Sequence, residues 1–302
     1  MLPILTIMHP LVDACSMGVL AVGGMAVERI LLYNALAFAL QLPLGVVADA
    51  RPRLSAAGFS LGVGLVCAAT LAAALGAGGW GVLSAACFGN ALFHLTAGKH
   101  VLDAHEGRSG PAGLFISTGA LGLLAGRLGV ERWDARCLPV FAALLGLCVA
   151  LAALRGVLGA MGGQERRHPF GTRRLPLEVA ILAGLFALIA WRSWAGLEAT
   201  RMTMAQGVAF LAAGAAVTWG GKVAGGYLAD LAGRWTVTAA SVCGSAALAF
   251  ACSPENVLAW LVLLFVSQLA TGPVLSLAYE NSGRSGGTAF GLNCLGLFAG
   301  SL

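Results

Sequence analysis

Apolar residues fill most of the chain in long runs, and short breaks rich in polar residues, glycine or proline separate one run from the next. Each run is close to the about 20 residues that an α-helix needs to cross the hydrocarbon core of a bilayer. The pattern predicts eleven membrane-spanning helices, over residues 3–24, 29–48, 55–77, 80–98, 110–130, 137–161, 176–197, 204–228, 235–252, 256–279 and 286–302. The fold class that we expect is therefore an all-α polytopic membrane protein.

The composition leads to the same class. Of the 302 residues, 59% are apolar and 10% are charged, whereas soluble domains carry about 25% charged residues. So few charges cannot build a surface that faces water, and the mean hydropathy of +0.86 agrees. A soluble, disordered or secreted protein is excluded. No basic segment precedes the first apolar run, so we expect no cleavable signal peptide.

The basic residues indicate an orientation in the membrane. The chain has 18 Lys and Arg against 13 Asp and Glu, and the net charge is +5. Because the basic residues are scattered at predicted helix ends, their excess does not indicate nucleic-acid binding. Loops after even-numbered predicted helices hold 12 of them and loops after odd-numbered helices hold 6. Basic loops stay in the cytoplasm, so we expect a cytoplasmic N-terminus in a bacterial inner membrane.

Similar segments recur in the two halves of the chain. In 45–53 and again in 226–234, a Gly is followed by Asp four residues later and by Arg eight residues later. Arg-Ser-Gly occurs at 108–110 and at 284–286. The two offsets, 181 and 176 residues, are nearly equal. Parallel repeats of this kind occur in transporters, so the pattern predicts two six-helix bundles related by an internal repeat.

The repeat divides the chain into three parts. We expect an N-terminal six-helix bundle over 1–161, a basic cytoplasmic linker over 162–175 and a C-terminal bundle over 176–302. The second bundle has about five helices and lacks the counterpart of the sixth. We therefore expect the natural protein to continue beyond the last residue.

The two Gly-Asp-Arg segments resemble the signature loop of the major facilitator superfamily. GVVADARPRL at 45–54 and GYLADLAGRW at 226–235 are similar to the loops that follow helices 2 and 8 in that family. The first copy has Pro52 where the family has Gly. The resemblance implies a twelve-helix fold and transport by alternating access, and it is nearly silent about the substrate. The family's antiporter signature is not clearly present, because Gly110-Pro111 lies at the start of its helix.

Polar residues inside the first predicted bundle form two candidate pairs. His9 and Asp13 are four residues apart on one helix, and Asn90 and His94 are four apart on another, so each pair lies on one helix face. The resemblance implies that both faces look into a central cavity. A His beside an Asp can take up and release a proton near neutral pH, as proton coupling requires. A static hydrogen-bonded lock between the two helices is the other interpretation.

The second half offers fewer polar candidates. Arg192 and Gln268 lie within predicted helices. Arg192 either binds an anionic group in the cavity or extends its charged end to the outer interface between two tryptophans. Lys99 and Lys222 are interpreted as ordinary charges at cytoplasmic helix ends.

The resemblance also implies a cytoplasmic gate. Asp49 would face the N-terminus of the last helix, just after Arg284, and Asp230 would face the N-terminus of the fifth helix, just after Arg108. The positive ends of those helices would attract the carboxylates. Gly45 and Gly226 would let the backbones approach, and Arg53 and Arg234 would hold the two Asp side chains in place.

The function that we predict is secondary active transport of a small organic solute by alternating access, with proton coupling. Two alternatives stay open: a membrane-embedded enzyme that uses His9, Asp13 and His94 as metal ligands or acid–base groups, and a receptor with a transporter fold. Against the enzyme, the chain has no H-E-x-x-H motif and no serine in a nucleophile elbow. We expect no cofactor, no metal, no nucleic-acid partner and a monomer in the bilayer.

Overall fold

The regular structure of the first half is helical throughout. A computed structural model describes residues 1–162, 176–204, 206–251, 253 and 256–302. From the N-terminus the elements are α1 (Leu2–Gly23), α2 (Val27–Asn34), a π-helical turn (Ala35–Ala39), α3 (Gln41–Ala50), α4 (Arg53–Ala74), α5 (Trp80–Ala104), α6 (Ser109–Ser117), α7 (Gly119–Trp133), a 3₁₀ turn (Asp134–Cys137), α8 (Leu138–Leu154) and α9 (Val157–Gly162).

The second half continues in the same way, and no strand occurs in the described residues. Its elements are α10 (Pro176–Met204), α11 (Val208–Ala232), α12 (Arg234–Ala251), α13 (Val257–Gln268), α14 (Thr271–Asn281) and α15 (Gly286–Ala299). The all-helical fold class predicted from the apolar runs is confirmed. The predicted linker lies almost wholly outside the described residues, and the division into two repeated bundles stays a prediction.

Two predicted spans are interrupted where prolines fall. The span predicted over 256–279 is divided between α13 and α14, and Pro273 lies four residues after the break at Leu269. A proline ring collides with the carbonyl four residues before it and removes one helical hydrogen bond. The π-helical turn before α3 precedes Pro43 by the same spacing. These breaks turn single predicted spans into pairs of shorter helices.

One predicted helix end was wrong, and the error comes from a lysine. Helix α5 was expected to stop before Lys99 but runs on to Ala104, and Lys222, interpreted as a charge at a helix end, lies well before the end of α11 at Ala232. A charged residue within an apolar run normally marks the membrane edge. Here both lysines lie inside their helices, so the charges are accommodated within the protein.

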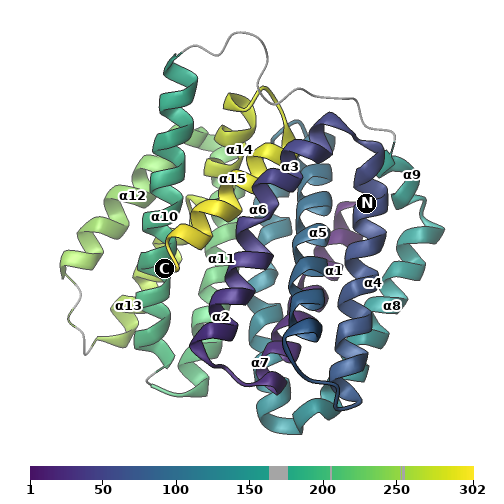
Figure 1. The fold of residues 1–302 in the computed structure, drawn as a ribbon. Coiled ribbons are helices and arrows are strands. Elements are labelled where there is room, and N and C mark those ends of the chain that lie inside the picture. Colours follow the sequence, from purple (N-terminus) through teal and green to yellow (C-terminus); the bar gives the residue numbers. More distant parts are fainter. Residues whose placement is uncertain (163–175, 205, 252, 254–255) are drawn as a thin grey trace.

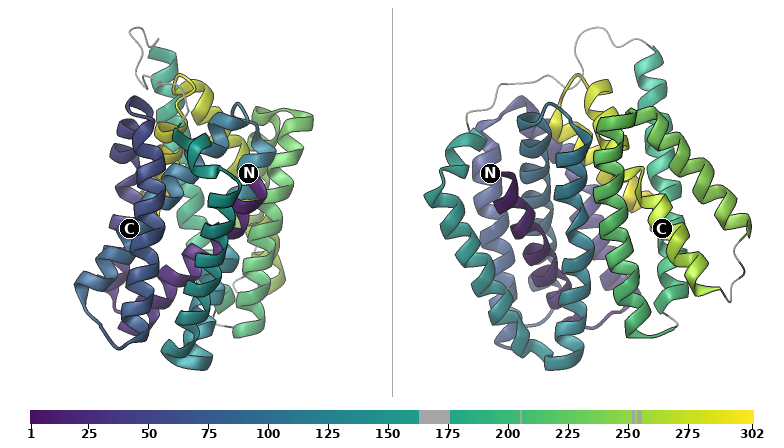
Figure 2. Two further views of the ribbon diagram at one scale, coloured as in Figure 1. Left: turned by 90° about the vertical axis from the view of Figure 1, so that its right-hand side faces the viewer. Right: turned by 180° about the vertical axis from the view of Figure 1, so that it is seen from behind.

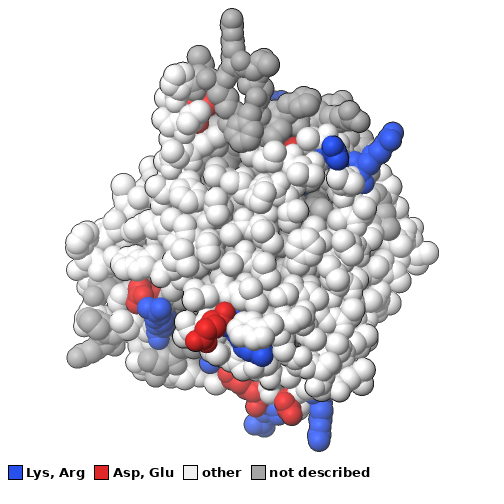
Figure 3. All heavy atoms as spheres, viewed as in Figure 1, with Lys and Arg blue, Asp and Glu red and all other residues white. Residues whose placement is uncertain are grey.

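The helices have the dimensions and surface of a membrane protein. Seven helical stretches in the described part of the chain are long and apolar enough to cross a membrane, and α15 is a shorter apolar helix. Figure 3 shows a broad uncharged band on the visible face, with acidic and basic side chains gathered toward the two ends. Such a band suits the hydrocarbon core of a bilayer. The protein is an integral membrane protein.

The two halves of the chain lie side by side and meet along two helix pairs (Figures 1 and 2). Helix α15 packs against α3, and α11 packs against α6. Residues 51–52, 105–108 and 282–285, between helices, lie at one end of the molecule, which we call the proximal end. The opposite end, called the distal end, carries residues 24–26 and 75–79. The helix pairs thus join the halves where the predicted gate lies.

Glycines allow these pairs to cross closely. A Cβ atom on Gly45 would lie 2.2 Å from the carbonyl oxygen of Gly287, and one on Gly226 would lie 2.5 Å from the carbonyl oxygen of Ser109. Both distances are far inside van der Waals contact, and the opposing atoms belong to the backbone. The two glycines of the repeated Gly-Asp-Arg segments therefore have the same role in the α3–α15 and α6–α11 contacts.

Replacing Gly45 by alanine tests this packing. The added methyl group cannot be accommodated by a side-chain rotation, so we expect Gly45→Ala to destabilise the fold by about 1–3 kcal/mol. Gly64→Ala is the matched control, because nothing lies within 4 Å of a Cβ built at Gly64. Thermal unfolding of both purified variants in one detergent measures the difference. Equal unfolding midpoints for the two variants would contradict the close approach of α3 and α15.

Candidate functional site

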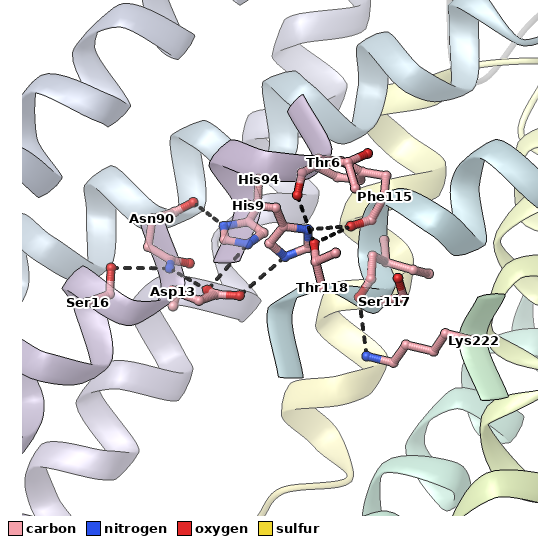
Figure 4. Close-up of polar contacts among 12 residues, drawn as sticks. Thr6, His9, Asp13, Ser16, Asn90, His94, Phe115, Ser117, Thr118 and Lys222 are labelled. Atoms are coloured by element: carbon pink, nitrogen blue, oxygen red, sulfur yellow. Dashed lines mark hydrogen bonds and ion pairs between the residues drawn. The ribbon is translucent and has the colours of Figure 1, made fainter. Parts of the chain in front are cut away.

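A cluster of titratable side chains lies in the middle of the first half. Helix α1 contributes His9 and Asp13, and α5 contributes Asn90 and His94, each pair one helical turn apart. The Nε2 atom of His9 lies 3.3 Å from Oδ2 of Asp13, and that of His94 lies 3.4 Å from Oδ1. Asn90 donates from Nδ2 to Asp13 Oδ1 at 3.0 Å. Figure 4 shows the two predicted pairs meeting around the carboxylate.

Backbone carbonyls fix which ring nitrogen of each histidine carries hydrogen. His9 Nδ1 lies 2.7 Å from the carbonyl oxygen of Phe115, and His94 Nδ1 lies 2.8 Å from that of Asn90. A carbonyl oxygen can only accept, so both Nδ1 atoms donate. In a neutral imidazole the other nitrogen, Nε2, then has a lone pair and no hydrogen. In both histidines this atom faces Asp13.

The arrangement therefore favours at least one bound proton. With both rings neutral, two nitrogen lone pairs would face carboxylate oxygens without a hydrogen between them, and all three side chains are buried. Protons on the Nε2 atoms would convert these contacts into charge-assisted hydrogen bonds. We call His9, Asp13 and His94 the His–Asp–His cluster. Its geometry supports reversible uptake of a positive charge inside the membrane.

The same three residues could also hold a metal ion. One ligand atom from each lies within 4.8 Å of the others. Two imidazoles and a carboxylate are ligands that divalent transition metals accept, and a Nδ1–H donated to a carbonyl is the usual way of orienting a metal-binding histidine. The sequence predicted no metal, and the donor set of the cluster is compatible with one.

A second polar group lies in the other half, around Arg192 of α10. Its side chain is buried, and Nη1 donates to Gln268 Oε1 at 2.9 Å and to Thr271 Oγ1 at 2.7 Å. Arg192 and Gln268 were both candidates, and they are in contact. The interpretation of Arg192 as a side chain that extends to the outer interface is wrong, because the guanidinium points to α13 and α14 instead.

Lys222 lies deeper in its helix than the sequence indicated. It lies two turns before Asp230 on α11, well inside the helix, and its Nζ donates to the carbonyl oxygen of Ile116 on α6 at 3.3 Å. The prediction of a helix-end charge is therefore wrong. Figure 4 shows its side chain reaching toward the region of Ser117. The sequence signal was an isolated lysine with apolar residues and glycines on both sides.

At the proximal end, Asp49 lies where the sequence placed it, at the N-terminus of α15. Its carboxylate accepts from Gly287 N at 2.9 Å, from Thr288 N at 2.7 Å and from Thr288 Oγ1 at 2.8 Å. Lys99 Nζ lies 3.1 Å from Oδ1, and both side chains are fully buried. Lys99 also pairs with Asp103. The unpaired N–H groups at a helix start and the helix dipole both favour such a carboxylate.

Asp230 makes the equivalent contact with α6. It accepts from Ser109 N at 2.9 Å and from Gly110 N at 3.0 Å. Arg108 Nε lies 3.7 Å from Oδ2. The Asp230 side chain is 13% exposed, and a cavity of about 450 Å³ lies beside it. This contact is the weaker of the two, because it has fewer donors and solvent reaches it.

The predicted roles of three arginines need correction or stay open. Arg53 is exposed and has no hydrogen bond or ion pair among the described residues, since Lys99 takes the place expected for it. Arg234 pairs with Glu280 and not with Asp230. Arg284 directly precedes the N-cap Ser285 of α15, as expected. The arginine of the repeated segment therefore does not hold its aspartate in either half.

Comparison with solved structures shows a shared fold. The chain is similar to the E. coli fucose:proton symporter, with a TM-score of 0.60, 13% identity and coverage of 99% of this chain and 88% of that one. The chain is also similar to a bacterial homologue of the iron transporter ferroportin in an outward-facing state, with a TM-score of 0.55, 16% identity and coverage of 99% of this chain and 89% of that one. No family model and no curated sequence matches the chain. The fold is that of the major facilitator superfamily transporters, as the signature loops predicted.

Removal of Lys99 tests the correction at Asp49. Lys99→Met leaves the fully buried Asp49 carboxylate without the ammonium beside it, so we expect a loss of about 3–5 kcal/mol of stability. Arg53→Met is the matched control and should change stability by less than about 0.5 kcal/mol. Unfolding titrations of the two purified variants measure this. A larger loss for Arg53→Met would return the charge-pairing role to the signature arginine.

Proposed function

We propose that this chain is a proton-coupled secondary transporter that moves a small organic solute by alternating access. The observation that carries the proposal is the His–Asp–His cluster, a buried site that can take up a proton, within a transporter fold. The two bundles, 1–161 and 176–302, would rock about a site between them. Proton coupling is supported by the cluster chemistry, and one of the similar solved structures is that of a fucose:proton symporter.

The contacts at the proximal end support an outward-facing conformation. Asp49 and Asp230 each bridge one half of the chain to a helix start in the other half. Together they would hold the proximal end closed. We place that end, and with it the N-terminus, in the cytoplasm because of the unequal distribution of basic residues between the loops. Substrate would then enter from the distal end.

The cluster suggests how a proton could drive the change of conformation. While protonated, the two imidazoles attract Asp13 and hold α1 against α5. Loss of the protons leaves the Nε2 lone pairs of His9 and His94 facing the carboxylate oxygens, and this repulsion favours a different arrangement of the two helices. Gly119 keeps α7 close to the cluster, since a Cβ there would lie 2.6 Å from Asp13 Oδ2. A change at Asp13 would therefore reach α7 directly.

A divalent metal ion is the second candidate cargo, because the cluster is also a suitable ligand set. One solved neighbour is described as a homologue of an iron transporter. Co²⁺ separates the two candidates. Visible absorption bands that disappear in His94→Ala would support a metal site, and their absence in the wild type supports the proton site. A receptor with a transporter fold would give neither metal binding nor flux.

Neutralising Asp13 tests proton coupling. We expect Asp13→Asn to fold and to exchange solute down its own gradient, but to lose uptake driven by a pH gradient, because the two imidazoles lose the carboxylate that stabilises their protonated form. Proteoliposomes that contain a pH-sensitive dye report proton entry when each member of a metabolite library is added outside.

The matched control is Asp134→Asn, which removes an exposed carboxylate at the distal end. It should keep the wild-type proton flux. Uphill uptake by Asp13→Asn at the wild-type rate would mean that the cluster is a static lock between α1 and α5, and proton coupling through it would be wrong.

A further inference from the structure

Two cations lie in the interior of the second half without an acidic partner. Neither Arg192 nor Lys222 forms an ion pair with any carboxylate of the described residues. Arg192 is 4% exposed, and Lys222 is partly buried. Lys222 directly follows Gly221, where a Cβ atom would lie 2.9 Å from the Cβ atom of Gln268, and the Gln268 side chain accepts from Arg192. The buried carboxylate of Asp13 is already held by two histidines and an asparagine.

Such an arrangement is costly unless something negative completes it. Ionised side chains within a membrane are expensive and are almost always paired with a countercharge or with fixed dipoles. Arg192 uses only Nη1 for its two contacts, and its Nε is buried with no hydrogen-bond partner among the described residues. Among the described residues, Lys222 has one hydrogen-bond acceptor for its three N–H groups. Several charged donors thus remain available at one place.

From this surplus we infer that Arg192 and Lys222 form an anion-binding site and that the transported solute is a small organic acid with a carboxylate group. The inference rests on the proposed transport function. A guanidinium presents two parallel N–H groups that match the two oxygens of a carboxylate, and the ammonium adds a second charge without directional demand. Gln268 and Thr271 hold the guanidinium in position, so the fork is ordered before the acid arrives.

The position of Lys222 links this site to the proton site. Its hydrogen bond to Ile116 crosses from α11 to α6, and so from one half of the chain to the other. A bound carboxylate would compete with that carbonyl for the ammonium and weaken one contact between the halves. One proton taken up by the His–Asp–His cluster and the single negative charge of a monocarboxylate would then move together, with no net charge carried. This pairing explains why one half holds the cations and the other the proton acceptor.

A purely structural role makes different predictions. As latches, Arg192 would only hold α10 to α13 and α14, and Lys222 would only hold α11 to α6. Removal of either side chain would lower stability, and added acids would have no selective effect.

The test uses the full chain purified in detergent and measures its unfolding midpoint with matched solute pairs. Each acid is compared with its neutral amide: acetate with acetamide, lactate with lactamide, succinate with succinamide, and benzoate with benzamide. We expect at least one acid to raise the midpoint in a concentration-dependent way while its amide does not. In Arg192→Gln and in Lys222→Gln the apparent affinity should fall roughly ten-fold or more, because a charge-assisted hydrogen bond is lost.

A control variant and a conservative variant show whether the effect is specific to these two cations. Arg136→Gln removes an exposed arginine from the distal end and should bind like the wild type. If Arg192→Gln does not fold, Arg192→Lys keeps the charge but loses the fork, and it should weaken binding. An acid effect that is equal in wild type and variants, an equal effect of acids and amides, or no effect of any acid on the wild type would overturn the inference.

Uptake measurements separate this inference from the proposed function. Asp13→Asn should keep the stabilisation by the acid and lose its proton-driven uptake. If the wild type binds the acid but a pH gradient does not drive uptake, proton coupling fails and the anion site stands. If a pH gradient drives uptake of the neutral amide instead, proton coupling stands and the anion site fails.

Discussion

A carboxylate buried between membrane helices stays ionised only where donors surround it, and Asp49 is the residue on which the rest of the structure depends. Two backbone N–H groups, one hydroxyl and one ammonium converge on it. Three of these donors reach it only because α15 approaches α3 within the space that Gly45 leaves open. The repeated Gly-Asp spacing is therefore one device: the glycine permits the crossing, and the aspartate one turn later binds the helix start. If the Asp49 carboxylate is lost, no water inside the membrane can take its place as the acceptor for these donors.

The same device occurs in both halves with unequal strength. At a helix N-terminus a carboxylate contributes typically about 0.3–1 kcal/mol, and up to about 2 kcal/mol when partly buried. Asp49 is completely enclosed and has a lysine beside it, whereas Asp230 is partly exposed and has only a distant arginine. Two contacts of this size can hold one end closed and still be opened by a ligand or proton of modest binding energy. A much stronger contact would fix the protein in one state.

Much of this could be predicted from the sequence, because membrane helices have a fixed length and repeated motifs carry their own geometry. The helix positions, the meeting of His9 with Asp13 on one face, and the contacts of Asp49 and Asp230 all follow from spacing or from resemblance. The partners of charges could not be predicted. Lys99 and Lys222 both lie near predicted helix ends, where a charge is normally solvated. The contact of Lys99 with Asp49 on α3 and the contact of Lys222 with Ile116 on α6 exist only in the folded protein, and they show that both side chains point inward.

The predicted contacts of the arginines were wrong for a related reason. A signature motif places Arg53 and Arg234 four residues after their aspartates, but a helix ends between each pair, so the spacing no longer sets direction. The interpretation of Arg192 as a residue of the membrane interface was wrong because flanking tryptophans indicate an interface. Nothing in the sequence shows that Gln268 and Thr271 lie opposite Arg192. Residues on one helix can be related by periodicity, whereas contacts between helices require the fold.

The distance across the proximal end tests the central claim most directly. Spin labels on Arg51→Cys and Arg284→Cys, in a background without Cys243 and Cys252, report whether the two halves separate there. Pulsed electron paramagnetic resonance in nanodiscs should give one short distance for the chain with both aspartates. In the Asp49→Asn, Asp230→Asn variant a second, longer distance should gain population, more than in either single variant. An unchanged distribution would mean that the two carboxylates do not hold the proximal end closed.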